Sequence, residues 1–191
     1  MKVFYDFEFV EDGRTIEPLS LGMVNDRGET LYIIFDISDL DLLEKAQRHP
    51  FVSEHVLPKL IGGTSYAFVG QDGVRRLFGG PYIPHHQVGD IVKEFLLITC
   101  ADESGDLELW GYYSDYDHVA LAQLWGPMVN MPKDVPWYTR DLKQEIDRVG
   151  LREDELPQQH NEHHALADAL WNQQVHHMVT EVDWAIRNLQ R

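Results

Sequence analysis

Apolar and turn-forming residues alternate along the start of the chain in a way that predicts a three-stranded antiparallel meander. Three apolar runs of strand length are separated by short turn signals: residues 2–10, 19–24 and 30–37. The dipeptide Asp12-Gly13 is a strong signal for a tight turn between the first two. Pro18 is expected to mark the start of the second strand, because proline cannot donate a hydrogen bond within a ladder.

After residue 38 the pattern changes to helices that alternate with short strands. Helical spacing predicts helices at residues 39–48, 53–60, 88–101, 118–125, 142–149 and 165–189, with Thr180 a candidate break in the last. Short strands are expected at 107–113 and 136–139, while the Gly- and Pro-containing stretch 62–89 is expected to be mostly irregular. The succession predicts one α/β domain over residues 1–191, with helices on both faces of a mixed central sheet.

The first predicted strand carries two carboxylates that are unusual for its apolar surroundings. Asp6 and Glu8 are two positions apart, so they point to the same side of the strand at a separation of about 6.5 Å. They therefore repel each other beside an apolar sheet. A divalent cation such as Mg²⁺ would remove the repulsion, since hard cations bind carboxylate oxygens. The alternative is a solvated strand end with two free acids, and this motif alone favours that alternative.

A second acidic group falls where the strand at 107–113 gives way to a helix. Asp and Ser at such positions are frequent helix N-caps. Ser114 or Asp115 could take that role, which leaves Asp117 for another one.

The third polar stretch contains His163 and Asp168, five positions apart. On a regular helix they would lie about 140° apart around the axis, too far to share one face. Unless the two residues are unrelated, His163 is expected in a polar loop just before a helix whose first turns carry Asp168. A zinc hydrolase using His160, His163, His164 and an acid is a weaker hypothesis, because no H-E-x-x-H helix and no cysteine pair accompany the histidines.

Composition limits the classes of partner that the chain can hold. Its 32 acidic and 16 basic residues give a formal net charge of −16, whereas proteins that grip long nucleic acid are usually basic. An acidic surface for solubility explains this charge, and metal-binding acids are the sharper explanation. A single cysteine, Cys100, excludes a disulfide framework and favours a reducing, cytoplasmic location. No secretory signal or membrane-spanning stretch is expected.

Three segments together resemble one known family of enzymes. They are "YDFEFVEDGRTIEPLSLG", "YDHVALAQLWGPM" and "HHALADA", which carry D-x-E, aromatic-Asp and H-x-x-x-x-D in that order. The chain resembles the DEDDh 3′→5′ exonucleases, and among them the small mycobacterial-type exoribonucleases. The resemblance implies a ribonuclease H-like fold and two Mg²⁺ or Mn²⁺ ions, held by Asp6, Glu8, Asp117 and Asp168, with His163 as general base.

The resemblance also implies a substrate and a way of holding it. The substrate would be the 3′ end of single-stranded RNA or a 3′ overhang, cleaved to nucleoside 5′-monophosphates. Glu8 would help position the terminal 3′-hydroxyl. Phe9 stands where many relatives have a small polar residue, and is the candidate contact to the terminal nucleotide. His164 stands where Asn is common, and it is a competing base.

Several questions stay open at the level of sequence. A 3′→5′ exodeoxyribonuclease of the same mechanism and a catalytically silent ribonuclease H-like module that binds RNA or a partner are the alternatives. Related enzymes often form homodimers, so a homodimer is expected, but no residues can be assigned to its interface. Residues 39–90 receive no role.

Overall fold

The predicted meander forms the centre of a mixed sheet. The structure is a computed structural model that describes all residues except 39, 69–74, 78–80, 101–105 and 190–191. The three strands are β1 (Lys2–Glu11), β2 (Ile16–Asn25) and β3 (Thr30–Ile34), and each pairs antiparallel with the next. β2 begins before Pro18, contrary to expectation. The pairing register shifts between Glu8 and Phe9, opposite this proline, and such irregularities are where a strand tolerates proline.

Four shorter strands extend this meander on both sides. They are β4 (Tyr66–Phe68), β5 (Arg75–Leu77), β6 (Glu108–Gly111) and β7 (Arg140–Asp141), and the described sheet has the order β5-β4-β3-β2-β1-β6-β7. β6 is parallel to β1, and β7 is parallel to β6. β7 therefore lies just after the strand predicted at 136–139. β4 and β5 lie within the stretch 62–89, which was expected to be mostly irregular. Strands this short show no periodic pattern of apolar residues, so whether they form depends on pairing with a neighbouring strand.

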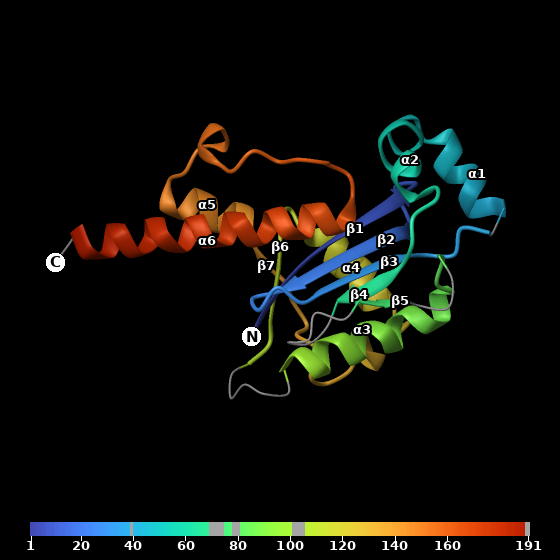
Figure 1. Ribbon diagram of the computed structural model, residues 1–191, viewed down its shortest axis with the longest axis horizontal. Coiled ribbons are helices and arrows are strands. Elements are labelled where there is room, and N and C mark those ends of the chain that lie inside the picture. Colours follow the sequence, from blue (N-terminus) through green and yellow to red (C-terminus); the bar gives the residue numbers. More distant parts are fainter. Residues whose placement is uncertain (39, 69–74, 78–80, 101–105, 190–191) are drawn as a thin grey trace.

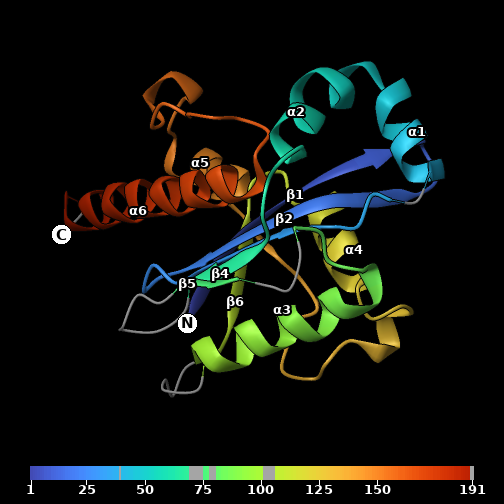
Figure 2. The ribbon, with the colours of Figure 1, turned by 45° about the vertical axis from the view of Figure 1, so that its right-hand side comes forward.

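Helices cover both faces of the sheet, as predicted (Figure 1). They are α1 (Leu40–Arg48), the π-helical turn η1 (Val52–Val56), α2 (Leu57–Leu60), α3 (His85–Cys100), α4 (Asp115–Gln123), the 3₁₀ turns η2 (Met128–Asn130) and η3 (Glu153–Glu155), α5 (Leu142–Val149) and α6 (Ala165–Leu189). α3 and α4 lie on one face, and α5, α6 and the α1–α2 segment lie on the other (Figure 2).

The helix predictions hold with three changes. The segment expected as a helix at 53–60 is η1 followed by the short α2. α3 and α4 each begin three residues earlier than predicted, and residues 39 and 101 of two predicted helices lie outside the described residues. α6 continues through Thr180, whose hydroxyl donates to the carbonyl of His176 (2.8 Å) and so needs no break in the helix. Among the described residues, none of the helices combines the length and the hydropathy of a membrane-spanning segment.

A close contact between β2 and α6 sets the position of that helix. Gly22 lies opposite Asp6 in the ladder. A Cβ atom on Gly22 would come within 2.3 Å of the backbone of Ala165 and Leu166, at the first turn of α6. Only glycine allows this approach, so residue 22 determines how near the start of α6 lies to β1.

Candidate active site

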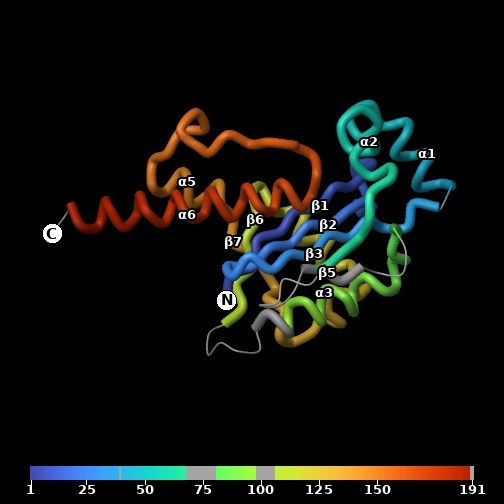
Figure 3. The backbone as a smooth tube through the Cα atoms, in the orientation of Figure 1, coloured from blue at the N-terminus to red at the C-terminus, as the bar shows by residue number. Residues whose placement is uncertain are grey.

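The five residues singled out as a catalytic group in the sequence line one cleft. Its volume is about 370 Å³, and its walls come from β1, the η1 segment, α4 and the start of α6. The loop between α5 and α6 runs back along α6 toward the η1–α2 segment, which brings the start of α6 beside that segment (Figure 3). The structure thus brings together Asp6, Glu8, Asp117, His163 and Asp168.

Strand β1 presents Asp6 and Glu8 to the cleft because alternate residues of a strand face the same side. Phe7 lies between the two acids and Tyr5 precedes them. Both aromatic residues are buried in the apolar cluster under α3 and α4. Asp6 is half-buried and Glu8 is only 8% exposed. Both carboxylates therefore stand at the boundary between the core and the cleft.

Helix α4 adds Asp117 in its first turn. This buried carboxylate accepts a hydrogen bond from the backbone N–H of Phe7 (2.7 Å), which ties α4 to β1. Ser114 occupies the N-cap position, one of the two alternatives expected, but its side chain makes no capping hydrogen bond, and Asp115 is already inside the helix. Instead Asp141 accepts hydrogen bonds from the backbone N–H (2.9 Å) and hydroxyl (3.3 Å) of Ser114.

Helix α6 adds Asp168, also in its first turn. Its carboxylate accepts a hydrogen bond from the side-chain amide of Gln159 (2.7 Å) and another from the backbone N–H of His163. A carboxylate oxygen of Asp168 lies within 4.8 Å of one of Glu8. The charge of Asp168 contributes to raising the pKa of Glu8.

His163 lies in the loop before α6, as the spacing predicted. Its φ of 62° is in the left-handed region, which is uncommon for residues other than glycine and is often found at functional sites. Its ring packs edge-to-face on Phe51, with centroids 4.7 Å apart. A ring nitrogen of His163 and carboxylate oxygens of Glu8 and Asp168 lie within 4.8 Å of one another, so this group could hold a metal ion.

The neighbouring histidines do not join this group. His164 stacks on Tyr32 with ring centroids 4.5 Å apart, and its Nδ1 accepts from the N–H of Ala167 (3.4 Å) at the start of α6. Burial lowers the pKa of His164. His160 is exposed, and neither histidine lines the cleft. Within the described residues, the three histidines of the zinc alternative therefore do not assemble.

The four carboxylates are held in conditions that favour their neutral forms. Burial raises the pKa of Glu8 to about 8, and the negative charge of Asp168 adds to the effect. Burial likewise raises the pKa of Asp117 to about 7, although the hydrogen bond from Phe7 opposes the change. The pKa of Asp6 is raised well above its usual range by burial and then by the charge of Asp117, and that of Asp168 is raised by burial. Four oxygen-donor groups that gain from neutralisation suit hard divalent cations.

Several residues that line the cleft could not be recognised as functional from the sequence. Gln159 holds Asp168, and Asn172 donates from its side-chain amide to the carbonyl of Tyr5 (3.1 Å), which links α6 to β1. Phe51 supports His163 from a segment that received no role. Polar residues in a loop and an aromatic beside a π-helical turn look ordinary until the chain is folded. Phe9, predicted to contact substrate, does line the cleft.

Comparison with known proteins places the chain in a class of enzymes. Residues 70–180 match the family described as "3'-5' exoribonuclease Rv2179c-like domain". The chain is also 35% identical over 191 residues to two proteins of Mycobacterium tuberculosis, "3'-5' exoribonuclease MT2234.1" of strain CDC 1551 and "3'-5' exoribonuclease Rv2179c" of strain H37Rv, with 100% of every chain covered. The class is that of the hydrolytic 3′→5′ exonucleases. Within it, the chain belongs to the Rv2179c-like exoribonuclease family, which confirms the resemblance seen in the sequence.

Gly22→Ala is expected to disturb the active-site cleft by changing how α6 packs against β2. The added methyl group must push the first turn of α6 away from β2, at a cost of about 1–3 kcal/mol of stability, and must carry Asp168 with it. We expect a lower melting temperature together with weaker divalent-metal binding by calorimetry. Met23→Leu, a volume-conserving change at the next position of β2, is the control. Unchanged metal binding in Gly22→Ala would show that this contact does not position Asp168.

Proposed function

We propose that residues 1–191 form a single ribonuclease H-like domain that shortens RNA from its 3′ end. The substrates are single-stranded RNA and 3′ overhangs, and the products are nucleoside 5′-monophosphates. The observation that carries the proposal is the convergence of Asp6, Glu8, Asp117, His163 and Asp168 in one cleft. The fold assignment is supported by the antiparallel β1–β3 meander, to which β6 and β7 are added in parallel.

Two Mg²⁺ or Mn²⁺ ions would be held in this cleft by Asp6, Glu8, Asp117 and Asp168. The fit rests on the donor set, because four crowded carboxylates with raised pKa values lose their mutual repulsion when cations replace protons. Bound ions would supply the positive charge that stabilises the attacking and leaving oxygens of a phosphodiester.

The protein's own groups would do the rest of the work. His163 would accept the proton of the attacking water, a role for which an imidazole side chain is suited. Its loop position leaves it able to adjust when substrate binds. Glu8 would also orient the terminal 3′-hydroxyl. Phe9 would contact the terminal nucleotide, and its ring lies 5.9 Å from that of the exposed Tyr116.

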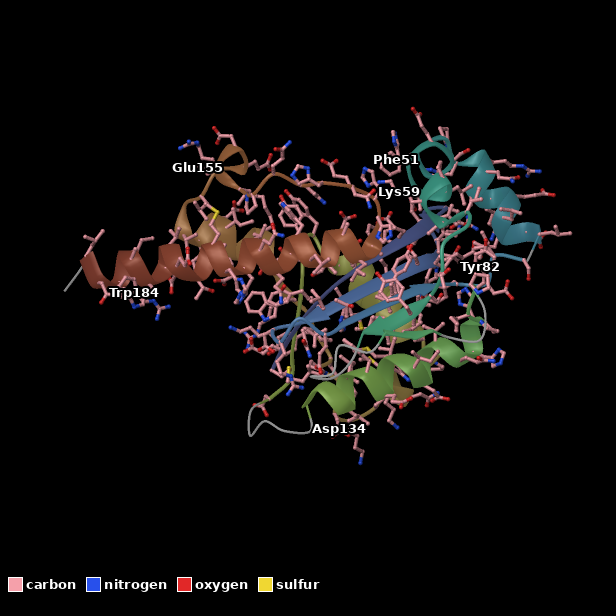
Figure 4. All side chains as sticks on the ribbon, viewed as in Figure 1. Phe51, Lys59, Tyr82, Asp134, Glu155 and Trp184 are labelled. Carbon is pink, nitrogen blue, oxygen red and sulfur yellow. The ribbon has the colours of Figure 1, made fainter. Side chains whose placement is uncertain are left out.

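RNA is favoured as the substrate because the matched family and both relatives are named as exoribonucleases. An exodeoxyribonuclease of the same mechanism is the alternative. A silent binding module is disfavoured, because repelling acids in a cleft bring it no benefit. The single Cys100 supports a cytoplasmic location. We also propose a homodimer, for which the 69% exposed Trp184, at the far end of α6 in Figure 4, is a candidate contact.

Degradation of labelled oligonucleotides tests the proposal. With Mg²⁺ or Mn²⁺, single-stranded RNA labelled at its 5′ end should give a ladder of products that shorten from the 3′ end. Circular RNA of the same sequence is the control, and it should stay intact because it has no end. Internal cuts in the circle would contradict the exonuclease proposal. A requirement for zinc would revive the histidine-rich hydrolase, and preference for DNA would support the exodeoxyribonuclease.

A further inference from the structure

A side pocket opens from the active-site cleft past His163. Its volume is about 400 Å³, and it shares Gln159 and His163 with the cleft as lining residues. Its other walls come from the η1–α2 segment and the loop before α6, including Lys59 and Asn161. The side pocket therefore adjoins the cleft at these two residues.

Lys59 brings a positive charge to the lining of the side pocket. Among the described residues, no Lys or Arg lines the cleft, and Lys59 is the one such residue that lines the side pocket. Its side chain is half-buried on α2, and in the described part of the chain no hydrogen bond or ion pair holds its ammonium group. Figure 4 shows it beside Phe51 above the strands, next to the loop that leads into α6.

The ammonium group of Lys59 belongs to a pocket that adjoins a cleft lined by four carboxylates. Once cations neutralise those carboxylates, the positive charge of Lys59 is left for another anion at the mouth of the cleft. Lysine binds phosphate as a flexible point charge.

We propose that the side pocket is a subsite for one backbone phosphate of the RNA strand, on the 5′ side of the scissile phosphate, with Lys59 as its cation. This inference rests on the proposed function. Asn161, exposed at the pocket with φ of 57°, offers a side-chain amide to the same phosphate. Glu54 and Glu162 are also exposed lining residues, and they repel further phosphates. A single phosphate contact is how a chain with net charge −16 can still hold RNA.

Two substrates distinguish a contact to this phosphate from an effect on the chemical step. An oligoribonucleotide has the neighbouring phosphate, whereas the p-nitrophenyl ester of a nucleoside 5′-monophosphate has only the scissile one. For Lys59→Gln we expect kcat/KM to fall about tenfold with the oligonucleotide, mainly through KM, and much less with the ester. The slope of log(kcat/KM) against log salt should become shallower by about 0.7, the value for one phosphate of a single strand.

Two further variants sharpen the result. Lys59→Arg keeps the charge and should restore most of the oligonucleotide affinity. Lys45→Gln removes an exposed lysine of α1 that pairs with Glu17 at 2.8 Å, and should change neither substrate. Equal losses on both substrates, or an unchanged salt slope, would overturn the phosphate subsite. Wild-type protein that leaves the RNA intact would instead contradict the exoribonuclease proposal, so the two failures are distinguishable.

Discussion

Asp6→Asn is expected to abolish RNA hydrolysis while preserving or raising the thermal stability of the metal-free protein. The half-buried carboxylate of Asp6 is destabilised by burial and by the charges of Asp117 and Glu8. An amide of the same shape removes that repulsion but is a poor ligand for a divalent cation. Thermal unfolding in EDTA, beside a hydrolysis assay with Mg²⁺, measures both effects.

The stability effect has a predicted pH dependence. Because the pKa values of these acids are raised, the native metal-free protein binds more protons than the unfolded chain. Its stability therefore falls as pH rises from about 4, the usual carboxyl value, through the raised values of Asp117 (about 7) and Glu8 (about 8). Asp6→Asn should change the melting temperature little at low pH and raise it most at high pH.

Asp134→Asn is the matched control for this experiment. Asp134 is exposed on the opposite side of the molecule from Lys59 and Phe51 (Figure 4), so its substitution should leave hydrolysis and stability unchanged. If Asp6→Asn unfolds in EDTA while Asp134→Asn does not, the Asp6 and Glu8 pair is structural, and its assignment to metal binding is wrong.

His163→Ala is expected to lower turnover by about 10²- to 10⁴-fold, the usual contribution of a general base. Calorimetry is needed beside the kinetics, because His163 lies within reach of a cation held by Glu8 and Asp168. Retention of two-ion binding supports a base, and loss of an ion would identify His163 as a ligand.

His164→Ala serves as the control for this mechanism. Its stacking on Tyr32 and its bond from Ala167 stabilise the start of α6, so the variant should lose some thermal stability and little turnover. Should His164→Ala be inactive while His163→Ala turns over normally, the base is His164. Full activity in both variants would exclude a histidine base, although the four-carboxylate site could survive.

Local patterns in the sequence determined those parts of the protein that depend on neighbouring residues. The alternation in residues 2–10 predicted β1 and placed Asp6 and Glu8 on one side of it. The five-residue spacing between His163 and Asp168 predicted a loop followed by a helix, and α6 does begin at Ala165. Periodicity of this kind is a property of the chain itself, so no tertiary information was needed.

Residue patterns alone could not show that the site assembles. Nothing local places Asp117 beside β1, because that requires α4 to pack under the sheet and its carboxylate to accept from Phe7. Nor does anything local bring Asp168 to Glu8, which depends on the close approach of α6 that Gly22 allows. The family resemblance grouped these residues, and the packing of distant elements provides the physical reason.

Tertiary structure alone decided the elements without a periodic signal. β4 and β5 exist because they pair at the edge of the sheet beyond β3, and β7 begins at Arg140 because it pairs with Trp110. Lys59 was indistinguishable from any solvated lysine on a short helix. Its position beside the active-site cleft follows from how η1 and α2 fold over the start of α6, which is a relation between segments about a hundred residues apart in the sequence.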